Sequence, residues 1–196
     1  MPQQDARNAR RKFLIGLMWL CVAAMIPRRA FAQATDSTPP QPTTAFGEEV
    51  TLSAKTIVGV AGKASWDVAF PTLLESLKSI AGVLAKQKLR RAGLTMIIYD
   101  AVGNDGFSYF AAVPLAAAPS SSLPAPFAVK QSPAGKALKF FYRGSYDSMD
   151  IFYEGITNYL DEKQVERQGV FLEEYLTDPL TTAEDKLEIN VYVPVK

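Results

Sequence analysis

The sequence contains no histidine and a single cysteine, Cys21. Histidine is the usual general base beside a serine or cysteine nucleophile, and histidine and cysteine are the usual ligands of zinc and haem. Their scarcity argues against a histidine-assisted nucleophile and against a zinc or haem centre built on such ligands. A disulfide within the chain is excluded because there is no second cysteine. We therefore expect neither a metal nor a cofactor.

Residues 1–32 have the layout of a secretory signal peptide: a basic start, an apolar stretch and a cleavage site. The basic residues are Arg7, Arg10, Arg11 and Lys12. The apolar stretch, residues 13–26, is shorter than the roughly 20 residues that a membrane-spanning helix needs, so we expect no stable membrane span. Residues 30–32, Ala-Phe-Ala, place small side chains at the two positions that a signal peptidase reads. We predict cleavage near Ala32 and a periplasmic or secreted product that has lost Cys21.

The export route and the charge of the product follow from the same segment. Residues 10–14, RRKFL, also resemble a twin-arginine export signal, so the general secretory and twin-arginine routes both stay open. Beyond residue 32 the chain has 15 basic and 19 acidic residues, a net charge of −4, and no long basic run. Nucleic acid is therefore not an expected partner.

Two low-complexity segments divide the rest of the chain. Residues 33–46, QATDSTPPQPTTAF, are rich in proline and threonine and are expected to be a disordered linker. Residues 116–126, AAAPSSSLPAP, form a second linker. The domain at 47–196 thus consists of two modules, 47–115 and 127–196.

The two modules repeat one another. Ser-Trp-Asp at 65–67 recurs as Ser-Tyr-Asp at 145–147, 80 residues later, which makes Trp66 and Tyr146 repeat mates. Each module shows a strand pattern, an amphipathic helix pattern and two further strand patterns. The expected strands are 55–62, 95–100, 107–114, 136–143, 170–177 and 187–195, and the helices begin near Pro71 and after Asp147 or Ser148. This order predicts an α+β fold of two β-α-β-β modules in pseudo-two-fold repeat.

Apolar stripes indicate how the elements pack. Each predicted helix is apolar on one side, and the last strand alternates apolar and polar residues. Its apolar row, best placed under the helices, is Leu187, Ile189, Val191 and Val193. We therefore expect an antiparallel sheet with the helices on one face and a ligand groove on the other.

Residues 171–179 read FLEEYLTDP, a strand followed by a turn. Because side chains alternate along a strand, Glu173 shares a face with Phe171 and Tyr175, while Glu174 points to the other face. A carboxylate in apolar surroundings is costly and its pKa rises. A ligand cation and a structural partner such as a lysine or a tyrosine therefore both stay open as explanations of Glu173.

Three stretches of the second module resemble the GyrI-like small-molecule-binding family, also called the bacterial activator effector-binding domain. They are SPAGKALKFFYRGSYDSM at 132–149, EEYLTDP at 173–179 and KLEINVYVPVK at 186–196. The resemblance is good across residues 127–196 and rests mainly on the repeat across residues 48–115. It implies the fold predicted above and a groove that binds organic, often cationic and aromatic, molecules.

The resemblance also implies which residues line the groove. Glu173 matches the family's central carboxylate, and Tyr175 and Tyr192 match groove-lining positions. Asn190 stands where the family usually has a second acid, so the groove keeps one carboxylate of two. The other candidate residues, from the strand faces and the repeat, are Phe171, Tyr142, Tyr146, Trp66, Tyr99 and Phe110. For the aromatic candidates, packing within the fold and contact with a ligand stay open as alternatives.

The favoured function is that of an exported protein that holds a small hydrophobic or cationic organic molecule in the groove. Two alternatives stay open. A hydrolase of small electrophilic compounds would use Glu173 as a general base and Tyr175 as an acid. A protein-interaction module would bind a protein partner through a related surface.

Overall fold

Two modules of the same order make up the described part of the chain, residues 46–169 and 171–196 of the computed structural model. The first contains β1 (Glu48–Leu52), β2 (Thr56–Ala64), α1 (Ala69–Gln87), β3 (Thr95–Gly103) and β4 (Gly106–Pro114). The second contains β5 (Phe127–Gln131), β6 (Gly135–Gly144), α2 (Met149–Glu162), β7 (Phe171–Tyr175) and β8 (Leu187–Pro194). The predicted signal peptide and residues 33–45 of the predicted linker lie outside the described residues.

The predicted β-α-β-β order is confirmed, and each module also begins with a strand that sequence analysis does not predict. These strands, β1 and β5, are five residues long, and all their residues are exposed or half-buried, so they lack the buried apolar residues that mark the other strands. Each pairs with the other module, β1 with β6 and β5 with β2. The single antiparallel sheet has the order β1-β6-β8-β7-β3-β4-β2-β5. Exchanging the modules reverses this order, as expected of a pseudo-two-fold repeat.

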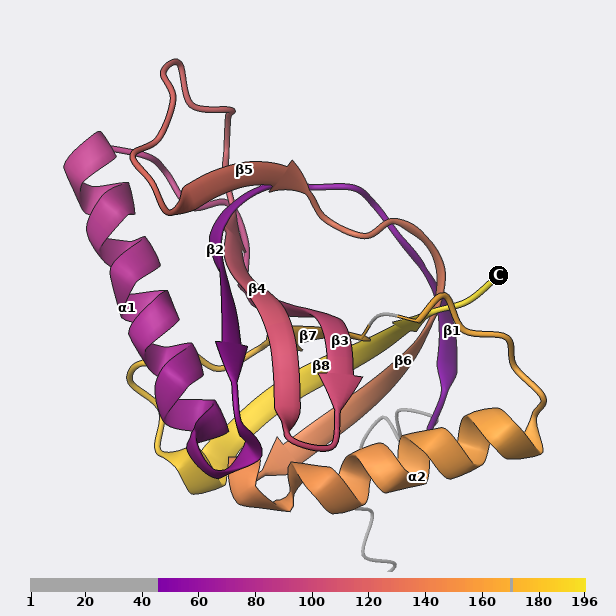
Figure 1. Cartoon of the computed structure of the whole chain (residues 1–196). Helices are drawn as coiled ribbons and strands as arrows, with labels where there is room; N and C mark the ends of the chain where they lie inside the picture. Colours follow the sequence, from indigo (N-terminus) through magenta and orange to yellow (C-terminus); the bar gives the residue numbers. More distant parts are fainter. Residues whose placement is uncertain (1–45, 170) are drawn as a thin grey trace, which may run out of the picture. The chain divides into compact units, whose positions relative to one another are not determined.

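Both helices pack on one face of the sheet, over opposite halves of the strand order (Figure 1). α1 lies against β2 and β4, and α2 lies against β6. Their buried residues include Phe70, Leu73, Leu77 and Ile80 on α1, and Met149, Ile156 and Leu160 on α2. The predicted apolar row of β8, Leu187 to Val193, packs in the same core and is fully buried. The central strands β7 and β3 lie between the parts that the two helices cover.

The opposite face of the sheet carries a second, smaller core. Its buried residues are Ile57, Met96, Ile98, Phe110, Ala112 and Leu172. The connections from β1 to β2 and from β5 to β6 meet beside it. The backbone N–H of Lys55 donates to Ser132 Oγ at 2.9 Å, and the backbone N–H of Ser132 donates to the Lys55 carbonyl at 2.9 Å. The two modules are thus joined on this face by their connections as well as by their strands.

The segment Trp66–Gln87, which contains α1, is long and apolar enough to cross a membrane by length and composition alone. In the fold, however, the buried residues of α1 face β2 and β4. A helix with one apolar side against a sheet is equally typical of a protein core. That the chain has no stable membrane span stays a prediction.

Candidate functional site

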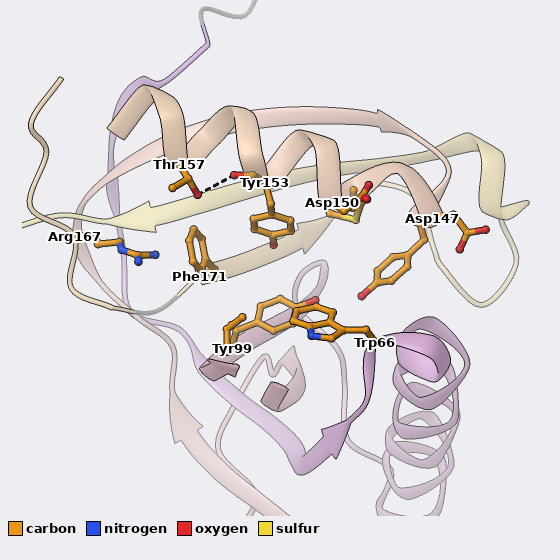
Figure 2. A pocket seen from close by; sticks show the side chains of 11 residues that line it. Trp66, Tyr99, Asp147, Asp150, Tyr153, Thr157, Arg167 and Phe171 are labelled. Atoms are coloured by element: carbon orange, nitrogen blue, oxygen red, sulfur yellow. Dashed lines mark hydrogen bonds between the residues drawn. The ribbon is translucent and has the colours of Figure 1, made fainter. Parts of the chain in front are cut away.

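A cavity of about 660 Å³ lies on the helix side of the sheet, within the range of ligand pockets in proteins. Its lining residues come from both modules (Figure 2): Trp66, Tyr99, Val102, Tyr146, Asp147, Met149, Asp150, Tyr153, Thr157, Arg167 and Phe171. Sequence analysis predicts the groove on the opposite face, and the structure differs. Each helix covers the outer strands of its own module and leaves the middle of this face, over β3 and β7, uncovered. The cavity lies there, bordered by β3, β7 and α2.

A β-bulge in β3 sets two lining residues on one face. The register of β3 with β4 shifts between Tyr99 and Ala101, which leaves Asp100 without a partner on β4. In a regular strand Tyr99 and Val102 would face opposite sides, because they are three positions apart. The extra residue restores the alternation, so both side chains reach the cavity.

The repeat mates Trp66 and Tyr146 both line the cavity, each from the short turn that precedes its helix. The indole N–H of Trp66 donates to the carbonyl of Gly103 at 3.1 Å, and 49% of the residue is exposed. The ring of Tyr146 stacks on Phe70 of α1 with centroids 4.7 Å apart. These contacts fix one aromatic wall from each module.

Glu173 lies beneath the aromatic lining and is 0% exposed. Its side chain points to the helix side, because its partners across the sheet are Ile97 of β3 and Val191 of β8, which lie in the helix-side core. The hydroxyl of Tyr153 donates to Glu173 Oε1 at 2.7 Å, and the hydroxyl of Tyr175 donates to Oε2 at 2.9 Å. Because Tyr153 lines the cavity, its side chain lies between the buried carboxylate of Glu173 and the open space and is hydrogen-bonded to that carboxylate.

Burial sets the protonation of this cluster. Desolvation raises the pKa of Glu173 above its usual value of 4.5, although hydrogen bonds from Tyr153, Tyr175 and Tyr99 oppose the rise. Desolvation and the neighbouring Glu173 charge together raise the pKa of Tyr153 and of Tyr175. The phenols therefore remain hydrogen-bond donors to the carboxylate at neutral pH.

A pH-dependent stability follows from the raised pKa of Glu173. Because the folded state holds this proton more tightly than the unfolded state, we expect the free energy of unfolding to fall as the pH rises from 4.5 through the folded pKa. The measurement is urea denaturation of the wild type and of Glu173→Gln between weakly acidic and neutral pH. The wild type should lose stability relative to the variant as the pH rises. A difference that stays constant over this range would contradict the assignment.

Four of the predicted residues lie away from the cavity. Tyr142 is buried in the helix-side core, where its hydroxyl donates to the carbonyl of Ser145. Phe110 belongs to the core of the opposite face, against which Tyr192 packs, and Asn190 shares the face of Tyr192. The alternation that places Val191 on the helix side turns its two neighbours to the other side.

Glu174 occupies that other face with partners of its own. Lys55 Nζ lies 2.9 Å from its Oε1, and the hydroxyl of Tyr192 donates to its Oε2 at 3.1 Å. A smaller hollow of about 230 Å³ adjoins these residues. The two neighbouring carboxylates thus have different surroundings: Glu174 is paired with a cation, whereas Tyr153 and Tyr175, which donate to Glu173, are neutral phenols.

Sequence analysis missed seven lining residues: Val102, Asp147, Met149, Asp150, Tyr153, Thr157 and Arg167. Four of them follow the helical period on α2, where Met149, Tyr153 and Thr157 are four residues apart and Asp150 adjoins the first. Tyr153 could have been found as the flank of the apolar stripe on this helix. Val102 could not, because its orientation depends on the bulge.

The cavity offers aromatic surface and charge. Its charged lining residues are Asp147, Asp150 and Arg167, with Glu173 behind Tyr153. Within residues 46–169 and 171–196, no three His, Cys, Asp or Glu side chains are grouped so as to hold a metal ion. Aromatic rings beside carboxylates suit the noncovalent binding of an organic molecule.

Solved structures share the fold of this chain. The C-terminal domain of EcmrR superposes with a TM-score of 0.65 at 10% identity, over 76% of this chain and 96% of that domain. In an EcmrR–DNA complex the TM-score is 0.67 at 11% identity, and the match spans only 57% of the EcmrR chain. SAV2435, solved bound to tetraphenylphosphonium, matches with a TM-score of 0.54 at 17% identity, over 78% of this chain and 94% of that one. A comparison with curated proteins finds no match.

At these identities the neighbours establish the fold alone. The sequence goes further: residues 48–196, nearly the whole described region, match the family model of the GyrI-like small molecule binding domain. Sequence motifs, fold and family match thus agree, and the chain belongs to the GyrI-like family of small-molecule-binding domains.

Proposed function

We propose that the chain is an exported protein whose cavity holds a hydrophobic organic cation. The observation that carries this proposal is the fully buried Glu173 behind the aromatic wall of the cavity. An ionised carboxylate in such a place is costly, and a ligand cation beside it would offset that cost. Phenol donors stabilise the charge of the Glu173 carboxylate less than a cation does, so a ligand cation would add stabilisation that the phenols do not supply.

The aromatic lining adds a second source of affinity. Trp66, Tyr99 and Tyr146 present ring surface to the cavity, and a cation over such a ring gains about 0.5–2 kcal/mol. The solved neighbour bound to tetraphenylphosphonium supports the same ligand class by analogy. Tetraphenylphosphonium is therefore a suitable first probe.

Charge selection can be tested with two probes of one shape. We expect tetraphenylphosphonium to change the emission of Trp66 and to bind at least about tenfold more tightly than the tetraphenylborate anion. The Glu173 carboxylate attracts the cation and repels the anion, and a Coulomb difference of about 1.4 kcal/mol corresponds to tenfold in Kd. The measurement is fluorescence and calorimetric titration of Trp19→Phe, which leaves Trp66 as the single tryptophan. Equal affinity for both probes would show that the site is a hydrophobic pocket that does not select for charge. Binding that is detected by calorimetry without any change of emission would show that Trp66 does not contact the ligand.

Binding is favoured over hydrolysis by the surroundings of Glu173. Both carboxylate oxygens accept hydrogen bonds from phenols, and the side chain is out of reach of bulk water. A general base needs an oxygen within hydrogen-bond reach of the water that it activates. Turnover of an electrophilic ester that Glu173→Gln abolishes would favour the hydrolase instead.

Export rests on the basic start, the apolar stretch and the Ala-Phe-Ala site of residues 1–32. We expect fractionation of a Gram-negative host that expresses the full chain to yield soluble periplasmic protein beginning at Gln33. N-terminal sequencing measures this directly. Uncleaved or membrane-embedded product would contradict export. An exported domain would also be separated from the chromosome, in line with the expectation that nucleic acid is not a partner.

A further inference from the structure

The cavity carries charges of opposite sign at its two sides. Figure 2 shows Arg167 with Phe171 on one side of Tyr153, and Asp150 and Asp147 on the other side. Within the described residues, none of the three charged side chains forms an ion pair. A wall built only for a lipophilic cation gains nothing from a guanidinium, which repels such a ligand.

The position of Arg167 is fixed by contacts on both sides of it. Its backbone forms a bridge with Val195 beyond the end of β8, and the neighbouring Gln168 N–H donates to the Pro194 carbonyl at 2.9 Å. Its guanidinium lies 5.4 Å from the ring centre of Phe171. A cation–π contact of this kind holds the guanidinium near the ring while leaving its N–H groups free to bind.

Arg167 is connected to the buried carboxylate through aromatic rings. Phe171 meets Tyr153 edge-on with centroids 5.3 Å apart, and Tyr153 donates to Glu173. The cation site and the arginine therefore share one wall and can contact the same ligand. A guanidinium presents paired N–H donors that match a carboxylate or a phosphate.

From this arrangement, which rests on the proposed function, we propose that the ligand is amphoteric: a hydrophobic cation that also carries an anionic group, a carboxylate or a phosphate, bound by Arg167. The cationic part lies among Trp66, Tyr146 and the acids, with Glu173 behind it. The anionic part lies at the Arg167 side. Arg167 is then a specificity-determining residue of the cavity.

The test compares two dyes with the same cationic ring system, rhodamine B, which carries a free carboxylate, and its ethyl ester, which does not. We expect the wild type to bind rhodamine B about tenfold or more tightly than the ester, the range of a hydrogen bond between charged groups. Arg167→Gln should lose this preference because its affinity for rhodamine B falls. Its affinity for the ester should equal or exceed that of the wild type. Fluorescence anisotropy of the dyes measures all four affinities.

The matched control is Arg143→Gln, an exposed arginine that lies beside Glu188 and does not line the cavity. It should keep the wild-type preference. If the ester binds the wild type as tightly as rhodamine B, or if Arg167→Gln strengthens both dyes equally, the amphoteric ligand is overturned while cation binding stands. If neither dye nor tetraphenylphosphonium binds, the proposed function itself is overturned, and the present inference with it.

Discussion

Ile156→Ala should lower the free energy of unfolding by about 2–5 kcal/mol, the usual cost of removing a buried isoleucine side chain. Ile156 is 0% exposed and lies midway along α2. Only two other residues of this helix, Met149 and Leu160, are buried, so no neighbouring turn can compensate for the loss. Urea denaturation, with the slope checked for an unchanged cooperative transition, measures the effect.

The matched control is Ile151→Ala on the same helix, because Ile151 is 70% exposed. The chemical change is the same, yet we expect the free energy of unfolding to change by no more than about 0.5 kcal/mol. Since α2 carries Tyr153 and Asp150 into the cavity, Ile156→Ala should also weaken tetraphenylphosphonium binding. Equal stability losses in the two variants would show that α2 does not pack as described.

The repeat and the helix patterns made most of the fold predictable from the sequence. The stripe of Met149, Ile156 and Leu160 and the row Leu187 to Val193 are periodic, and both lie in the helix-side core. β1 and β5 escaped prediction because an edge strand needs backbone partners and little apolar surface. Their partners, β6 and β2, lie in the other module, so nothing local in the sequence points to them.

The candidate site was predictable in its residue types and less so in its placement. Alternation correctly grouped Phe171, Glu173 and Tyr175 on one face. It could not tell which face holds the cavity, because that depends on how far the helices extend over the sheet. Tyr192 and Asn190 do lie on the predicted side of β8, opposite the helices, but the cavity lies on the other face, so these two residues adjoin Glu174 instead.

Glu173→Gln should weaken tetraphenylphosphonium binding by about 1.5–3 kcal/mol, on the order of ten- to a hundredfold in Kd, the Coulomb energy of opposite unit charges about 6–11 Å apart at an effective dielectric constant of about 20. The amide keeps the shape of the side chain and can still accept a hydrogen bond from Tyr153 or Tyr175, so only the charge is lost. The preference for tetraphenylphosphonium over tetraphenylborate should shrink in parallel. At neutral pH the variant should be as stable as the wild type or more stable, because a buried ionised group disfavours the empty fold. Titration of the Trp66 emission in the Trp19→Phe background measures both affinities.

Glu174→Gln is the matched control, since the two glutamates are adjacent in β7 and point to opposite faces. Glu174 is paired with Lys55, whose side chain is 42% exposed, so loss of this pair leaves a cation that water can solvate. We expect its affinity for tetraphenylphosphonium to stay near that of the wild type. If Glu173→Gln instead lowers the melting temperature and leaves the affinity unchanged, Glu173 serves only to hold Tyr153 and Tyr175 in place. The aromatic rings and the acids at the cavity wall would then have to account for any cation selectivity by themselves.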